Sequence, residues 1–296
     1  MTAPVVNAFT IDVEDWFQVS ALAPAVPRDS WSRQQYRVEQ NTEKILQLCS
    51  DAAVRGTFFV LGWVADRSPG LVRRIADAGH EVASHGWSHE LVYRQTPELF
   101  RDETRRSKGL LEDLTGTAVL GYRAASFSVT GASLWALDTL LDEGFVYDSS
   151  VFPIRHDRYG IPGAQTMPHL LTAPSGRQIA EFPMSTAAWL GQRVPVSGGG
   201  YFRLLPYALI RAGLREINGR QGQPFTFYLH PWEVDPSQPR LKVSALSRFR
   251  HYTNLSVCEA RLRRLLGEFS FASMRTVLGD RGLLQAPGPA AVSVPA

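Results

Sequence analysis

The chain has 296 residues, of which 31 are basic and 28 acidic, so its net charge at pH 7 is only +3. The two signs are intermingled, which excludes the basic stripe that nucleic-acid binding requires. No run of about 18 apolar residues occurs, so no transmembrane segment is expected. The first predicted strand begins close to Met1 and leaves no room for a signal peptide, so we expect a cytoplasmic protein. The sequence leaves the oligomeric state open, a homo-oligomer included.

Strand and helix patterns alternate along the chain. Apolar, β-branched runs predict strands at 7–11, 56–60, 81–84, 119–122, 145–148, 180–183 and 225–229. Helical spacing predicts helices at 43–52, 69–78, 97–115, 132–142, 206–218 and 257–269, the first of them behind a cap at Asn41 and Thr42. This repeated alternation favours an α/β barrel, in which catalytic groups sit at the C-terminal ends of the strands.

Two regions have weak periodicity. Segments 154–183 and 187–204 are rich in Pro, Gly and isolated aromatic residues, and we expect long loops over the mouth of the site. Residues 285–296 lack charge and aromatic side chains, which is typical of a disordered tail. The sequence therefore predicts one catalytic domain over residues 1–284.

Metal-binding residue types gather at two strand ends. His85 and His89 are four residues apart, so on one helical turn they would point the same way and bind one divalent metal ion. The first strand runs into Asp12, Glu14 and Asp15, whose mutual repulsion a cation relieves best. Together these residues suggest a mononuclear metal hydrolase.

Three later motifs follow in order, namely 121–127 (GYRAASF), 147–150 (YDSS) and 227–233 (FYLHPWE). With these motifs the chain resembles the polysaccharide deacetylases of the NodB-homology type, carbohydrate esterase family 4. Its branch also holds peptidoglycan deacetylases and metal-free allantoinases, and it is most similar to the subgroup linked to exosortase and exopolysaccharide gene clusters. The resemblance implies a distorted, incomplete (β/α) barrel of about seven strands. It also implies removal of N-acetyl groups from amino sugars of an exopolysaccharide or its precursor, with release of acetate.

The resemblance implies roles for individual residues. His85 and His89 match metal ligands, and the ion is zinc first, with cobalt, nickel and manganese compatible. Arg123 matches the arginine that orients the catalytic base. His230 matches the general acid that protonates the departing amine.

The acidic residues allow two assignments. Strand parity places Asp12 and Glu14 on one face, which makes Asp12 the base and Glu14 the ligand. Alignment with the family's adjacent acidic pair would instead make Glu14 the base and Asp15 the ligand. We favour the first assignment, and both stay open at this point.

Substrate contacts are expected from Ser126, Asp148 and Trp232. Ser126 follows Ala125, which stands where the family has Pro, so the turn that should help hold the oxyanion is altered. Two alternative functions remain. One is an allantoinase-like amidohydrolase acting on a small cyclic amide, and the other is a non-catalytic barrel that binds glycans.

Overall fold

The computed structural model describes residues 4–156, 158–189 and 191–284, and the predicted tail at 285–296 lies outside this range. Its centre is a nine-stranded sheet in the order β10-β1-β2-β3-β4-β5-β7-β6, with β11 pairing beside β1. The strands are β1 (Val6–Val13), β2 (Thr57–Val60), β3 (Glu81–Ser84), β4 (Gly121–Tyr122), β5 (Tyr147–Asp148), β6 (His169–Thr172), β7 (Gln178–Glu181), β10 (Thr226–Leu229) and β11 (Ser270–Ala272). The sheet therefore includes a strand at each of the seven predicted places.

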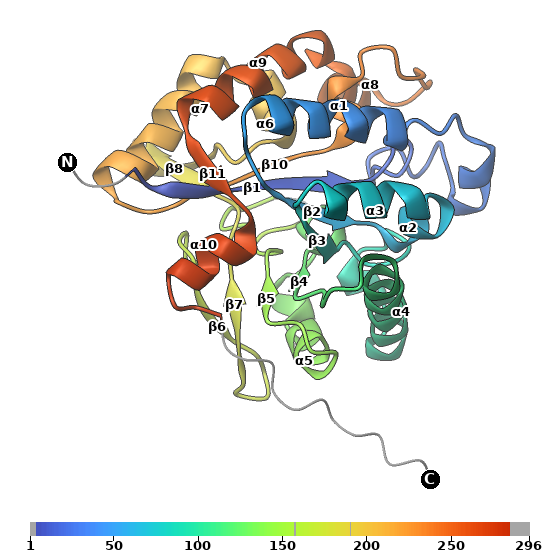
Figure 1. The fold of residues 1–296 in the computed structure, drawn as a ribbon, viewed down its shortest axis with the longest axis horizontal. Helices are drawn as coiled ribbons and strands as arrows, with labels where there is room; N and C mark the ends of the chain where they lie inside the picture. The colour runs from blue at the N-terminus through green and yellow to red at the C-terminus, as the bar shows by residue number, and fades with distance from the viewer. Residues whose placement is uncertain (1–3, 157, 190, 285–296) are drawn as a thin grey trace.

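The sheet is an incomplete barrel. Every pair is parallel except β6 with β7, and among the described strands β10 and β6 stay apart as the two ends of the order. The predicted distorted, open (β/α) barrel is confirmed (Figure 1). Because parallel strands share one direction, the C-terminal ends of β1, β3, β4 and β10 meet at one edge.

Helices lie around the sheet (Figure 1). Six of them correspond to predicted helices: α1 (Val38–Asp51), α3 (Pro69–Asp77), α4 (Pro97–Thr115), α5 (Trp135–Asp142), α7 (Tyr207–Arg215) and α9 (Leu255–Glu268). In α4 the Thr96 side chain caps the first turn by accepting from the N–H of Leu99, and Gly116 ends the helix at φ +65°. The other α-helices in the described part of the chain are α2 (Gly62–Arg67), α6 (Gly199–Leu204), α8 (Ala245–Tyr252) and α10 (Met274–Asp280).

The expectation of long loops is wrong in part. Strand β6 lies within 154–183, and the antiparallel pair β8 (Thr186–Trp189) and β9 (Gln192–Pro195) occupies much of 187–204, followed by α6. These are short strands of mixed polarity, which periodicity alone does not separate from loop.

The core is formed by the strands and the helices packed on them. Phe9, Ile11, Phe58, Val60 and Leu229 on three adjacent strands are fully buried. Such dense packing holds the strand ends rigidly, and the site is built on those ends. Among the described residues, none of the helices is both long enough and apolar enough to cross a membrane.

Candidate metal and catalytic centre

Three side chains meet where β1 and β3 end. The ligand atoms of Glu14, His85 and His89 all lie within 4.8 Å of one another, and all three residues are buried. Glu14 follows β1, and both histidines follow β3. Two imidazoles and one carboxylate are a ligand set that suits zinc and related divalent ions.

The histidines reach this position without a helix. Residues 85–91 form an irregular loop, and His89 has φ +54°, so the predicted helical turn is wrong. The Nδ1–H of His85 donates to the carbonyl of Arg123 at 2.8 Å, which leaves Nε2 of His85 available as a ligand. A hydrogen bond to a neighbouring strand end thus orients the ring.

The Glu14 carboxylate has an unsatisfied oxygen. Its Oε2 is buried and makes no hydrogen bond, although Nε2 of His89 lies only 2.7 Å away. An imidazole nitrogen and a carboxylate oxygen this close can share a bound cation when the nitrogen carries no proton. Burial raises the pKa of Glu14, but His89 and His230 outweigh it and bring the pKa well below its usual range. Burial lowers the pKa of His85 to about 4, so its ring is neutral at pH 7, as a ligand must be.

Asp15 does not join this cluster. Its Oδ1 accepts from the N–H of Trp16, and its Oδ2 accepts from the N–H groups of Arg37 and Val38 at 2.6 and 2.9 Å. Asp15 therefore satisfies the free N–H groups at the start of α1, a role the sequence assigned to Asn41 and Thr42, which lie inside the helix. The alternative with Asp15 as a metal ligand does not fit this geometry.

Asp12 faces the same side as Glu14 and is held by Arg123. Nη1 of Arg123 donates to Oδ1 of Asp12 at 2.6 Å and to Oγ1 of Thr10 at 2.8 Å. The rest of the guanidinium donates to the carbonyl and hydroxyl oxygens of Ser149, and the side chain is fully buried. A buried arginine so placed orients the Asp12 carboxylate and leaves its Oδ2 atom without a hydrogen bond from the guanidinium.

His230 completes the group from the end of β10. Its Nε2 lies 3.9 Å from Oδ2 of Asp12 and 3.6 Å from Oε1 of Glu14. Burial lowers the pKa of His230, but Glu14, Glu233 and Asp12 together raise it to about 9. The ring is therefore protonated at neutral pH and can donate a proton from Nε2.

A buried chain of hydrogen bonds runs from His230 through Glu233 to Arg203, and the sequence analysis did not predict it. Oε1 of Glu233 lies 2.8 Å from Nδ1 of His230, and Oε2 of Glu233 accepts from Nε of Arg203 at 2.5 Å. Burial raises the pKa of Glu233, but Arg203 and His230 bring it to about 2. Its position three residues after His230 was the available signal, whereas Arg203 lies in a glycine-rich stretch that gave none.

The three expected substrate contacts are placed differently from one another. Ser126 has φ +50° and lines a cavity of about 330 Å³, together with Tyr159, Tyr201 and Tyr228. Trp232 is buried between the rings of His230 and His251, and its indole N–H donates to Glu14, so its ring offers little surface for the expected sugar contact.

Asp148 also contacts no open space. It is fully buried and accepts from the hydroxyl of Ser150, whose oxygen in turn accepts from the N–H of Ala124. Burial raises the pKa of Asp148 to about 6. Asp148 thus supports the turn that carries Arg123, and its burial does not favour the expected substrate contact.

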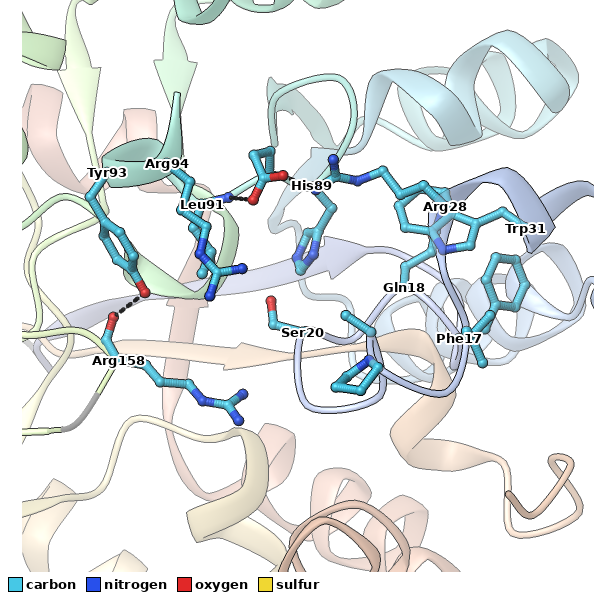
Figure 2. A pocket seen from close by; sticks show the side chains of 14 residues that line it. Phe17, Gln18, Ser20, Arg28, Trp31, His89, Leu91, Tyr93, Arg94 and Arg158 are labelled. Atoms are coloured by element: carbon cyan, nitrogen blue, oxygen red, sulfur yellow. Dashed lines mark hydrogen bonds and ion pairs between the residues drawn. The ribbon is translucent and has the colours of Figure 1, made fainter. Parts of the chain in front are cut away.

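A cavity of about 510 Å³ opens beside the metal cluster, and His89 is part of its wall (Figure 2). Its other walls come from the segment after β1 and from the loops around Tyr93 and Arg158. The hydroxyl of Tyr93 donates to the carbonyl of Arg158 at 3.0 Å and ties those loops together. The volume is within the range of small-ligand sites.

Comparisons with known proteins relate parts of the chain to two family models. Residues 29–140 match the family model of the polysaccharide deacetylases. This segment is therefore similar to the polysaccharide deacetylases. Residues 149–279 match a domain of unknown function, DUF3473, so His230 comes from a part of the chain outside the deacetylase match.

Curated relatives are similar over limited segments. The peptidoglycan deacetylase of Helicobacter pylori is 32% identical over 123 residues, which is 42% of this chain and 41% of that protein. The peptidoglycan-N-acetylglucosamine deacetylase of Bacillus cereus is 34% identical over 77 residues, 26% of this chain and 28% of that protein. The chain thus spans less than half the length of these relatives.

Solved structures match over nearly the whole chain. A Mycobacterium smegmatis protein assigned as a polysaccharide deacetylase has a TM-score of 0.63 at 21% identity, covering 100% of this chain and 98% of the other. PuuE allantoinase has a TM-score of 0.60 at 15% identity, covering 92% and 88%. At these identities the likeness shows the fold.

Proposed function

We propose that the protein is a metal-dependent N-deacetylase that removes acetyl groups from amino sugars of a polysaccharide or its precursor and releases acetate. One observation carries the proposal, namely the cluster of Glu14, His85 and His89 with Asp12 and His230 beside it. The match of residues 29–140 to the polysaccharide deacetylase family model supports the proposal.

Glu14, His85 and His89 would hold the ion, and the unsatisfied Oε2 of Glu14 fits that role. A divalent ion bound there would lower the pKa of a water molecule and polarise the acetamido carbonyl. Zinc is our first choice because all three ligands suit it.

The chain's own residues supply the proton transfers. Asp12 uses its Oδ2 atom to take the proton of the attacking water, while Arg123 orients the carboxylate through Oδ1. His230 donates from Nε2 to the departing amine nitrogen, because its Nδ1 faces Glu233. Glu233 and Arg203 hold the imidazole in that orientation.

The alternatives have weaker support. The likeness to PuuE allantoinase is one of fold, and the complete set of metal-ligand residues speaks against a metal-free mechanism. The same set of metal-ligand residues also speaks against a non-catalytic barrel that binds glycans. The exopolysaccharide substrate, the exosortase-linked subgroup and the cytoplasmic location carry over from the sequence as predictions.

Acetate release from an N-acetylglucosamine hexamer tests the proposal. Protein stripped by a chelator should release little acetate, and one equivalent of zinc should restore release. His85→Ala should not be restored, whereas the matched control His169→Ala, in β6 at the far end of the sheet, should behave like the parent protein. Hydrolysis of allantoin without acetate release would favour the allantoinase alternative. Unchanged acetate release after chelation would exclude the metal mechanism.

A further inference from the structure

The wall of the 510 Å³ cavity is strongly basic. Arg28, Arg94 and Arg158 line it, and Glu90 is the acidic residue among its described lining residues. Three guanidinium groups against one carboxylate leave two uncompensated positive charges. The whole chain carries a net charge of only +3, so this concentration at one cavity is unusual for the molecule.

The arginines differ in their partners. Arg28 contacts Glu90 at 2.8 Å, whereas Arg94 and Arg158 form no ion pair with any residue in the described part of the chain. In Figure 2 the guanidinium ends of Arg94 and Arg158 point toward the same open space beside Ser20 and His89. Two unpaired guanidinium groups facing one space suit an oxyanion, whose oxygens match their N–H donors.

The basic cavity lies directly beside the candidate metal cluster. His89 belongs to both the cavity wall and the candidate metal cluster. A glycan whose acetamido group lies at the cluster would therefore place a neighbouring sugar in the cavity. The polar groups of Gln18 and Ser20 also line this space and can accept or donate hydrogen bonds to sugar hydroxyls.

We infer that the cavity binds an anionic group of the glycan, a carboxylate or a phosphate, on a sugar next to the one that is deacetylated. The inference rests on the proposed function for the position of the acetamido group. Arg94 and Arg158 are the residues that recognise the anion, whereas Arg28 forms an ion pair with Glu90. The enzyme thus prefers acidic glycans to neutral ones.

The test compares three oligosaccharides of equal length. One is the neutral N-acetylglucosamine tetramer, one alternates N-acetylglucosamine with glucuronic acid, and one carries a phosphate on a terminal sugar. For the parent protein we expect kcat/KM for one acidic oligosaccharide to exceed that for the neutral tetramer by about tenfold. Whether the carboxylate or the phosphate gives the gain identifies the anion. The double variant Arg94→Gln/Arg158→Gln should lower this acidic-to-neutral ratio by about tenfold.

A matched double variant controls for net charge. Arg73→Gln/Arg220→Gln removes two exposed arginines that line none of the described cavities, and it should keep the parent's ratio. An unchanged ratio in the cavity variant, or equal loss in both variants, would overturn the inference while acetate release still supports deacetylation. If no glycan yields acetate, the proposed function fails. Calorimetric binding of the same three oligosaccharides then decides the anion site separately, because equal affinities would overturn it.

Discussion

The hydrolytic centre and the cavity beside it hold their side chains in opposite ways. Asp12, Glu14 and Arg123 are at most 2% exposed and stand on or directly after strands, with partners around them. Arg94, at the end of the short 3-10 helix Val92–Arg94, and Arg158, on a loop, are exposed, and their guanidinium groups face open space. Rigid strand ends suit chemistry that needs fixed distances, whereas loop residues suit selection of the substrate.

The largest effect should come from neutralising the buried base, Asp12. Asp12→Asn keeps the shape of the side chain but cannot take a proton, so we expect kcat to fall by about 10³-fold with the metal still bound. Acetate-release kinetics and metal analysis measure the two quantities. A fall of less than tenfold would show that Asp12 is not the base, and Glu14 would then be the remaining candidate. Thermal unfolding checks that Arg123 tolerates the loss of its charged partner.

The next largest effect should come from the general acid. His230→Ala should lower kcat by roughly 10²-fold, the usual size for a lost proton donor. The pKa of His230 is raised to about 9, so activity of the parent protein should fall as the pH rises through that value. The variant should lack this alkaline limb. Retention of the limb together with a raised KM would make His230 a substrate-binding residue instead.

A smaller effect distinguishes the two ends of β3. His85 follows this strand at the site, whereas His80 precedes it and accepts the N–H of Gly56 on Nδ1 at 3.1 Å. Burial lowers the pKa of His80 from 6.5 to about 4. Between these two pH values the histidine is protonated in the unfolded chain but neutral in the folded protein. The contribution of His80 to the free energy of unfolding should therefore fall as the pH drops from 6.5 toward 4, by roughly 1 to 2 kcal/mol between pH 7 and pH 5.

Urea unfolding at pH 7 and pH 5 measures this difference. His80→Gln should show a smaller pH dependence than the parent protein, because the titrating group is gone. His169→Gln, at the far end of the sheet, serves as the control. Equal pH dependence in the parent and His80→Gln would contradict the lowered pKa of His80 in the folded protein.

The sequence was informative about the buried centre for a physical reason. Residues such as His85, Arg123 and His230 directly follow short apolar strands, and parallel strands bring such positions to one edge. The local path between them was less predictable. The spacing of His85 and His89 suggested a helical turn. In the structure a loop after β3, with a positive φ at His89, brings the two side chains together instead.

The cavity could not be predicted in this way. Arg94 and Arg158 are 64 positions apart in the sequence and come together only through the fold and the contact of Tyr93 with the Arg158 carbonyl. Asp15 was misleading for the same reason, because the N–H groups that it accepts from belong to Arg37 and Val38, at the start of a helix far along the chain. Long-range partners of this kind leave no local pattern.

The central claim is that Glu14, and not its neighbour Asp15, binds a metal ion with His85 and His89. Metal analysis of purified Glu14→Gln and Asp15→Asn tests it most directly, with thermal unfolding as a check on folding. We predict that Glu14→Gln loses most of its bound ion, whereas Asp15→Asn keeps about one equivalent but unfolds at a lower temperature, because the N–H groups at the start of α1 lose a charged acceptor. Loss of the ion from folded Asp15→Asn with retention in Glu14→Gln would contradict the account.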